Sequence, residues 1–308
     1  MTLQNNNISK IIKFYQTEGL TNTALRLISD LFLISSKQLT SLSYYLQNVN
    51  IINSKDNAIL MRNNIFNNCH KNRRCFVIGN GPSLKTQDLS YLKNELTFVV
   101  SGFYKHPIVE QWQPNYYCFA DAVFYDGSEQ VRKFFLDLSD HIYSSIFFMP
   151  LQGRKIFLEN YHLPIERTYF TLFKGELGKR LVRFPDLRKA IPGVQGVSQM
   201  PIMMAMYMGC SPIYLLGMDH DWLAQRGMDR HFYKETTVHG HPVAHGNLDA
   251  YSYESELIAV LNLWKGYNNL KKVANQHNIQ IINATNGGFL DVYPRVKYET
   301  LFDLPAVL

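Results

Sequence analysis

The sequence predicts an α/β fold, a doubly wound and mostly parallel Rossmann-like sheet preceded by an N-terminal helical extension. Short apolar runs recur along the chain and end in Gly, Ser, Asn or Asp, as expected of buried parallel strands that stop at turns. Helical stretches intervene, and strands that alternate with helices form a parallel sheet covered by those helices. The 308 residues are enough for one such domain and an extension.

Residues 1–70 differ from the rest because they are rich in Asn, Ser, Leu and Ile and poor in Gly and Pro. Apolar positions such as Leu25, Ile28 and Leu31 recur at about helical spacing, which predicts helices. We expect this extension to pack on the domain formed by residues 71–308 or on a second subunit, which would make a homo-oligomer. The alternative is peripheral contact with the inner membrane, although Lys and Arg are sparse for a segment that binds anionic lipids.

Cysteine usage and hydropathy predict a cytoplasmic protein. The four cysteines form no CxxC pair, which favours reduced thiols in the core. No apolar run reaches the roughly 20 residues that a membrane-spanning helix needs. The net charge of +6 favours anionic partners, but the basic runs are short, so we expect no nucleic acid.

The elements of the main domain follow one another from residue 74 onward. Strands are expected at residues 75–78, 96–100, 116–120, 213–216 and 279–283, and helices at residues 199–208 and 252–276. In a doubly wound sheet, ligands bind beyond the carboxyl ends of the strands. The turns after these runs are therefore expected to build the site.

The turn after the first strand reads Gly79-Asn80-Gly81-Pro82-Ser83. Its glycines allow the backbone to approach a ligand closely, and its amides could hold a phosphate near a helix start. It lacks the third glycine of a dinucleotide turn and the Lys-Ser/Thr pair of a P-loop, so neither a dehydrogenase nor a standard NTPase is expected. A tight turn without a ligand is the alternative. Asn80 favours binding, because an amide at a strand end is better suited to ligand hydrogen bonds than to packing.

Two later segments also offer polar groups at strand or helix ends. Residues 193–201 open an apolar helix whose small residues could admit an anion or serve close packing, and its methionines are best explained as core. Asp219 and Asp221 resemble the DxD pair that binds a metal in many sugar transferases, and loop histidines follow. We expect no metal, because those histidines have no fixed spacing and no cysteine joins them.

Three of these motifs together resemble a known group. They are residues 78–84, the helix 196–209 leading into residues 213–219, and a downstream loop histidine. The chain resembles the bacterial sialyltransferases that use CMP-sialic acid and the related motility accessory factor (MptE-like) glycosyltransferases, over residues 74–295. That resemblance implies a GT-A-like variant of the Rossmann-like sheet. An archaeal pterin diphosphokinase family looks similar over the same motifs.

The resemblance also implies roles for individual residues. The nucleotide would contact Gly79, Asn80, Gly81, Ser83, Ser101, Asp121, Gly196, Ser198, Gly217, Met218 and Asp219. A loop histidine would be the general base, with His245 preferred to His231 because it lies shortly before the last long helix. Tyr233 would steady the departing phosphate.

The expected function is therefore inverting transfer of a nonulosonic acid or related keto-sugar, of the sialic acid, pseudaminic acid or Kdo type, from a CMP donor to a cell-surface glycan. Such a reaction would belong to capsule or lipopolysaccharide synthesis in a bacterium. A single leaving phosphate carries less charge than a diphosphate, so hydrogen-bond donors can replace a metal and no cofactor is expected. The alternatives are an ATP-dependent pterin-type diphosphokinase, which would need magnesium, and a non-catalytic nucleotide-binding module.

Overall fold

The computed structural model describes residues 38, 39, 42, 55–161, 163–179, 183–225, 230–234 and 252–302. It divides the chain into two units, Met1–Ser54 and Lys55–Leu308, and the second is the α/β unit described below. Most of the expected extension, residues 1–70, lies outside the described residues and stays a prediction. Its last part belongs to the α/β unit, because Leu60, Asn63 and Phe66 are buried there.

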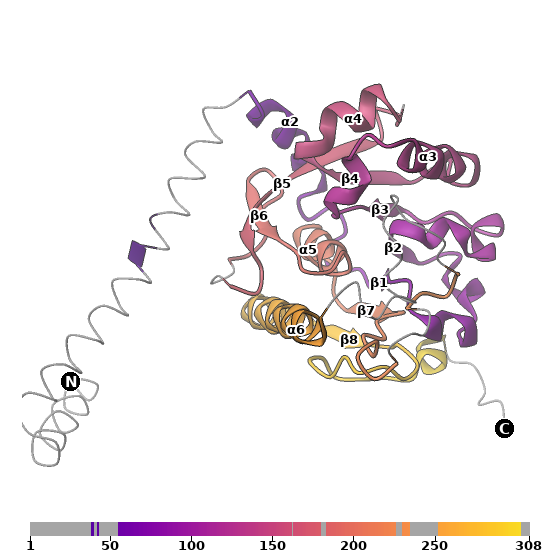
Figure 1. Cartoon of the computed structure of the whole chain (residues 1–308). Coiled ribbons are helices and arrows are strands. Elements are labelled where there is room, and N and C mark those ends of the chain that lie inside the picture. Colours follow the sequence, from indigo (N-terminus) through magenta and orange to yellow (C-terminus); the bar gives the residue numbers. More distant parts are fainter. Residues whose placement is uncertain are drawn as a thin grey trace, which may run out of the picture. The chain divides into compact units, whose positions relative to one another are not determined.

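The α/β unit is built on one eight-stranded sheet in the order β6-β5-β4-β3-β2-β1-β7-β8 (Figure 1). Each pairing within it is parallel, which confirms the doubly wound Rossmann-like prediction. The strands are β1 (Cys75–Ile78), β2 (Leu96–Val100), β3 (Tyr116–Cys118), β4 (Ile146–Pro150), β5 (Thr168–Glu176), β6 (Ala190–Gly193), β7 (Ile213–Leu216) and β8 (Ile281–Asn283).

One described α-helix precedes β1, and the others connect later strands. The helices are α2 (Asn57–Met61), α3 (Glu129–His141), α4 (Arg154–Glu159), α5 (Gln199–Tyr207) and α6 (Tyr253–Gln276). Every residue of α5 is buried, and α5 packs on β1, β2 and α6. Its methionines are therefore core residues, as the sequence indicated.

Short 3-10 helices, rather than α-helices, follow the strands at the centre of the sheet. Pro82–Thr86 follows β1, Ser101–Lys105 and Pro107–Glu110 follow β2, and Ala122–Tyr125 follows β3. Such a helix is too short to present a strong dipole to an anion. The helix start expected near Ser83 is thus only a five-residue 3-10 turn.

Residues just before β1 tie the chain to the opposite half of the sheet. The Asn63 amide nitrogen donates to the carbonyl oxygens of Phe170 and Leu187, each at 2.8 Å. Phe66 packs edge-on against Phe148, with ring centroids 5.1 Å apart, and against other aromatic rings of β3 and β5. These contacts make residues 63–66 part of the core.

Candidate functional site

The chain reverses its direction across the sheet between β1 and β7. From β1 it runs outward through β2 to β6, and it then returns to place β7 on the other side of β1 (Figure 1). Ile78 is in register with both Val99 of β2 and Leu216 of β7, so the turns after these strands share one edge. A strand-order reversal opens a crevice at the carboxyl edge, where doubly wound proteins bind ligands.

The two turns at this crevice are joined backbone to backbone. Gly79 N–H donates to Leu216 O at 2.8 Å, and Gly81 N–H donates to Gly217 O at 3.0 Å. Gly217 has a φ of +63°, which an L side chain rarely adopts. The glycines are therefore needed for this close approach, and the predicted site residues Gly79, Gly81 and Gly217 do come together.

Asp219 fastens the second turn to the first through Ser83. Its Oδ1 accepts from the Ser83 N–H at 2.9 Å, and its Oδ2 accepts from the Ser83 hydroxyl at 2.8 Å. Burial raises the pKa of the Asp219 carboxyl, and the two bonds from Ser83 act in the opposite direction. A Cβ on Gly81 would collide with this carboxylate. The amides of Gly79, Gly81 and Ser83 thus already have acceptors within the protein.

Asn80 is buried between these turns, and its side-chain amide is hydrogen-bonded through the nitrogen atom. Its Nδ2 donates to Val100 O at 3.1 Å, which fixes the amide orientation. Its Oδ1 is buried and has no hydrogen-bond partner among the described residues. A buried acceptor without a partner is costly, so it is usually matched by a water or a ligand.

Residues 230–234 bring the expected catalytic groups to the same place. The backbone N–H of Phe232 donates to Asn80 O at 2.8 Å, and Phe232 separates His231 from Tyr233. The His231 and Tyr233 rings are stacked, with centroids 5.1 Å apart and planes 5° apart. Tyr233 lies against Gly102, where a Cβ would collide with the phenol. The fold thus places the second candidate base, His231, and the expected phenol, Tyr233, beside the predicted nucleotide turn.

Ser101 and Asp121, the expected contacts that follow β2 and β3, have different surroundings. Ser101 follows β2 with a φ of +46°, an unusual conformation that non-glycine residues adopt mainly at constrained or functional positions. Its carbonyl accepts from the Tyr117 hydroxyl at 2.6 Å, and it adjoins Gly102 and so Tyr233. Asp121 is exposed and caps the next 3-10 helix by accepting from Val123 N–H at 3.1 Å. Nothing in the described residues ties Asp121 to the glycine turn.

A second hydrogen-bond network, partly buried, links the start of α5 to the turn after β7. The Tyr267 hydroxyl lies 2.7 Å from Ser198 Oγ and 2.7 Å from His220 Nε2. Burial lowers the pKa of His220 to about 3, so the imidazole is neutral at ordinary pH. The hydroxyl of Ser198, an expected nucleotide contact, is therefore engaged with Tyr267.

The neighbouring expected contacts, Gly196 and Met218, have packing environments. A Cβ on Gly196 would press on Leu263, and Met218 is buried with its N–H donating to Thr285 Oγ1 at 3.1 Å. Their direct contact with a nucleotide stays a prediction. His245 lies outside the described residues.

The carboxylates of the DxD-like pair have separate partners. Asp221 Oδ2 accepts from the Gln225 side chain at 2.7 Å, whereas Asp219 is bonded to Ser83. Within the described ranges, no three His, Cys, Asp or Glu side chains are placed to hold a metal ion.

In those same ranges, no helix combines the length and apolar character that crossing a bilayer requires.

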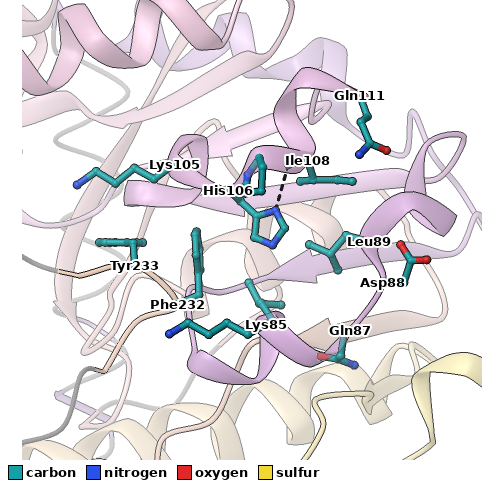
Figure 2. A pocket seen from close by; sticks show the side chains of 12 residues that line it. Lys85, Gln87, Asp88, Leu89, Lys105, His106, Ile108, Gln111, Phe232 and Tyr233 are labelled. Carbon is teal, nitrogen blue, oxygen red and sulfur yellow. Dashed lines mark hydrogen bonds between the residues drawn. The ribbon is translucent and has the colours of Figure 1, made fainter.

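A pocket that the sequence did not indicate adjoins the site. It has a volume of about 550 Å³, and Figure 2 shows its lining. Phe232 and Tyr233 form one wall, Lys85 and Lys105 lie on its rim, and His106 lies inside. The available signal was the His106-Pro107 pair that opens a short helix just after the second strand.

A family model described as 6-hydroxymethylpterin diphosphokinase MptE-like matches residues 45–225. The chain belongs to this family. The MptE-like match includes β1 to β7 and therefore both turns at the crevice. It confirms the family resemblance of the sequence motifs.

Two solved structures are also similar to this MptE-like chain. The MAf glycosyltransferase from Magnetospirillum magneticum AMB-1 has 12% sequence identity and a TM-score of 0.43, with 79% of this chain and 38% of that chain covered. The chain thus spans well under half of that protein. The sialyltransferase CstII from Campylobacter jejuni, in complex with CMP-3FNeuAc, has 11% identity and a TM-score of 0.41, with 73% and 86% covered. No curated protein matches the chain.

Proposed function

We propose that this MptE-like protein is an inverting glycosyltransferase that moves a nonulosonic acid or related keto-sugar from a CMP donor to a cell-surface glycan in the cytoplasm. The observation that carries the proposal is Asn80 at the strand-order reversal. Its Nδ2 is bonded to Val100 O, so the remaining polar atom is an acceptor, Oδ1. An acceptor calls for a donor on the ligand, such as a ribose hydroxyl or the exocyclic amino group of cytosine.

The same turn is poorly suited to holding a phosphate by its amides. The N–H groups of Gly79, Gly81 and Ser83 donate to Leu216 O, Gly217 O and Asp219 Oδ1. We therefore place the nucleoside at Asn80 and the phosphate toward Tyr233, whose hydroxyl can donate to an anionic oxygen. Phe232, bonded to Asn80 O, links these two parts of the site.

His231 and Tyr233 supply the two proton-handling groups that direct displacement needs. The acceptor hydroxyl gives its proton to an imidazole nitrogen as its oxygen bonds to the anomeric carbon. The bond from that carbon to the phosphate oxygen breaks at the same time, and CMP leaves with its charge stabilised by the Tyr233 hydroxyl. Attack opposite the leaving group inverts the anomeric centre. His245 is the alternative base.

We propose that the reaction proceeds without a divalent metal. The Asp219 carboxylate is bonded through both oxygens to Ser83, and the role that these bonds support is fastening the two turns. A donor with one phosphate can be balanced by hydrogen-bond donors alone, whereas ATP chemistry relies on carboxylate-held magnesium.

The family description favours a second candidate, an ATP-dependent diphosphokinase acting on a pterin. Both candidates transfer a group from a nucleotide. They differ in the nucleobase, which is cytosine or adenine, and in whether the reaction needs a metal ion. The test is to incubate the full chain with CMP-sialic acid, CMP-pseudaminic acid, CMP-Kdo, or ATP with 6-hydroxymethylpterin, with magnesium or with EDTA, and to measure the released nucleotide.

Release of CMP that persists in EDTA supports the proposal. Release of AMP that requires both the pterin and magnesium would replace it with the diphosphokinase. An Asp219→Ala chain is a poor control because it would also release the turn, so Asp221→Asn is the matched variant for a metal role.

A further inference from the structure

The pocket beside the glycine turn is a cavity lined by polar as well as apolar side chains. It lies between the 3-10 helix that follows β1 and the two that follow β2, and Phe232 and Tyr233 close one side (Figure 2). Its volume of about 550 Å³ is within the range of small-molecule sites. Leu84, Leu89 and Ile108 give it an apolar floor.

Two lysines make the rim of this pocket positive. Lys85 and Lys105 are exposed residues that line it, one from each side of the cavity (Figure 2). Lys105 Nζ lies 4.7 Å from the centroid of the Tyr233 ring, which holds its charge close to the wall that faces the nucleotide turn. Among the described residues of the lining, the one carboxylate is Asp88, which accepts from the Ser90 N–H at 2.9 Å and thus caps the next helix.

His106 supplies an uncharged donor inside the pocket. Its Nδ1 accepts from the Ile108 backbone N–H at 3.2 Å, so in the neutral ring the proton is on Nε2. Figure 2 shows that second nitrogen directed away from Ile108 toward Lys85. The ring stacks on Phe103, with centroids 5.8 Å apart, and meets Phe232 edge-on at 5.0 Å. These contacts fix the direction in which Nε2–H points.

We propose that this pocket binds an oxyanion, the carboxylate or phosphate of an acidic acceptor sugar, between the His106 Nε2–H and the ammonium groups of Lys85 and Lys105. A fixed neutral donor and two exposed cations around an apolar floor suit one anionic group on a compact organic body. The assignment of this ligand as the acceptor rests on the proposed function. Binding of the oxyanion itself does not.

Two substitutions at His106 separate ligand binding from structural support. In His106→Asn, the short amide oxygen can still cap the Ile108 N–H, but no donor reaches the pocket. In His106→Gln, an amide nitrogen can replace Nε2–H, but the cap on Ile108 is lost. A ligand-binding role and a capping role therefore predict opposite orders for the two variants.

The experiment measures binding by calorimetry or NMR titration on the full chain without nucleotide. The probes are glucuronate, glucose 6-phosphate and uncharged glucose, so that a carboxylate and a phosphate are tested separately against the same ring. We expect one or both acidic sugars to bind and glucose to bind at least about tenfold more weakly, because hydrogen bonds to a charged group are the stronger class.

His106→Asn should weaken binding of the acidic sugar about tenfold with its thermal unfolding unchanged, and His106→Gln should bind more tightly than His106→Asn. Lys85→Gln should weaken binding several-fold, whereas the matched control Lys93→Gln, an exposed lysine outside the pocket, should not. Equal binding of glucose, a failure of both acidic sugars to bind, or unchanged affinity in His106→Asn would overturn the proposal. Since no nucleotide is present, these outcomes are independent of the CMP test.

Discussion

The partly buried imidazole of His220 makes the stability of the fold depend on pH in a way that one substitution can isolate. Its Nε2 lies 2.7 Å from the Tyr267 hydroxyl, and its ring lies among Tyr267, Trp222 and Trp264. Burial lowers its pKa from 6.5 to about 3. The unfolded chain therefore binds a proton at His220 at pH values where the folded protein does not, so acid favours unfolding.

The size of the effect follows from the two pKa values. The contribution is fully present above pH 6.5 and is lost progressively as the pH falls toward 3. Between pH 7.5 and pH 5 the free energy of unfolding should fall by about 2 kcal/mol through this group alone. His220→Gln keeps a hydrogen-bonding side chain of similar reach toward Tyr267 but does not titrate.

The assay is urea unfolding, followed by tryptophan fluorescence, of the wild type and His220→Gln at both pH values. The loss of stability on acidification should be about 2 kcal/mol smaller in the variant, and the contributions of other titrating groups cancel in this comparison. Equal pH dependence in the two proteins would refute the reasoning, because it would mean that the ring is hydrated or charged in the folded state.

Three further predictions concern the site and its support. Asn80→Ala should weaken CMP binding about two- to tenfold in calorimetry, whereas the exposed Asn94→Ala should not, and equal affinities would remove Asn80 from the nucleotide site. Of His231→Ala and His245→Ala, the variant that lacks the base should lose about 100-fold or more in turnover with donor binding nearly intact, and near-normal turnover in both would exclude the base mechanism. A chain starting at residue 71 should be less stable to urea than one starting at residue 55 by more than about 3 kcal/mol, because it lacks the buried Phe66; similar midpoints would contradict that packing.

The sequence predicted the centre of the sheet better than its far edge. The runs at β1, β2 and β7 are wholly or mostly buried, so they are apolar except for Thr97, and each is followed by glycine or serine. β6 contains Pro192, which argues against a strand except at a sheet edge, where it in fact lies. β5 mixes buried with partly exposed residues and ends in exposed ones, so it lacks that signal.

The sequence predicted that the glycine turn and Asp219 lie at one edge of the sheet, but it did not predict how they are bonded. The glycine turn and Asp219 could be placed at one edge because parallel strands align their carboxyl ends. That Asp219 is bonded to Ser83 could not be predicted, because it requires β7 to lie beside β1 rather than at the end of the strand order. His106 was not predicted as a ligand-binding residue, because the tautomer and direction of its ring depend on contacts that no sequence pattern indicates. These contacts are the hydrogen bond from the Ile108 amide and the packing against Phe103 and Phe232.

The position of β1 between β2 and β7 also determines when the crevice can form during synthesis. Strands β1 to β6 are neighbours in chain order and can pair as each is made, but β1 then presents an unpaired, wholly apolar edge. Only when Ile213–Leu216 pairs with β1 is that edge covered and Asp219 brought to Ser83. A chain that stalls on the ribosome before this point therefore exposes a strand edge prone to aggregation. Its glycine turn also lacks the bonds to residues 216–219 that hold the turn in place.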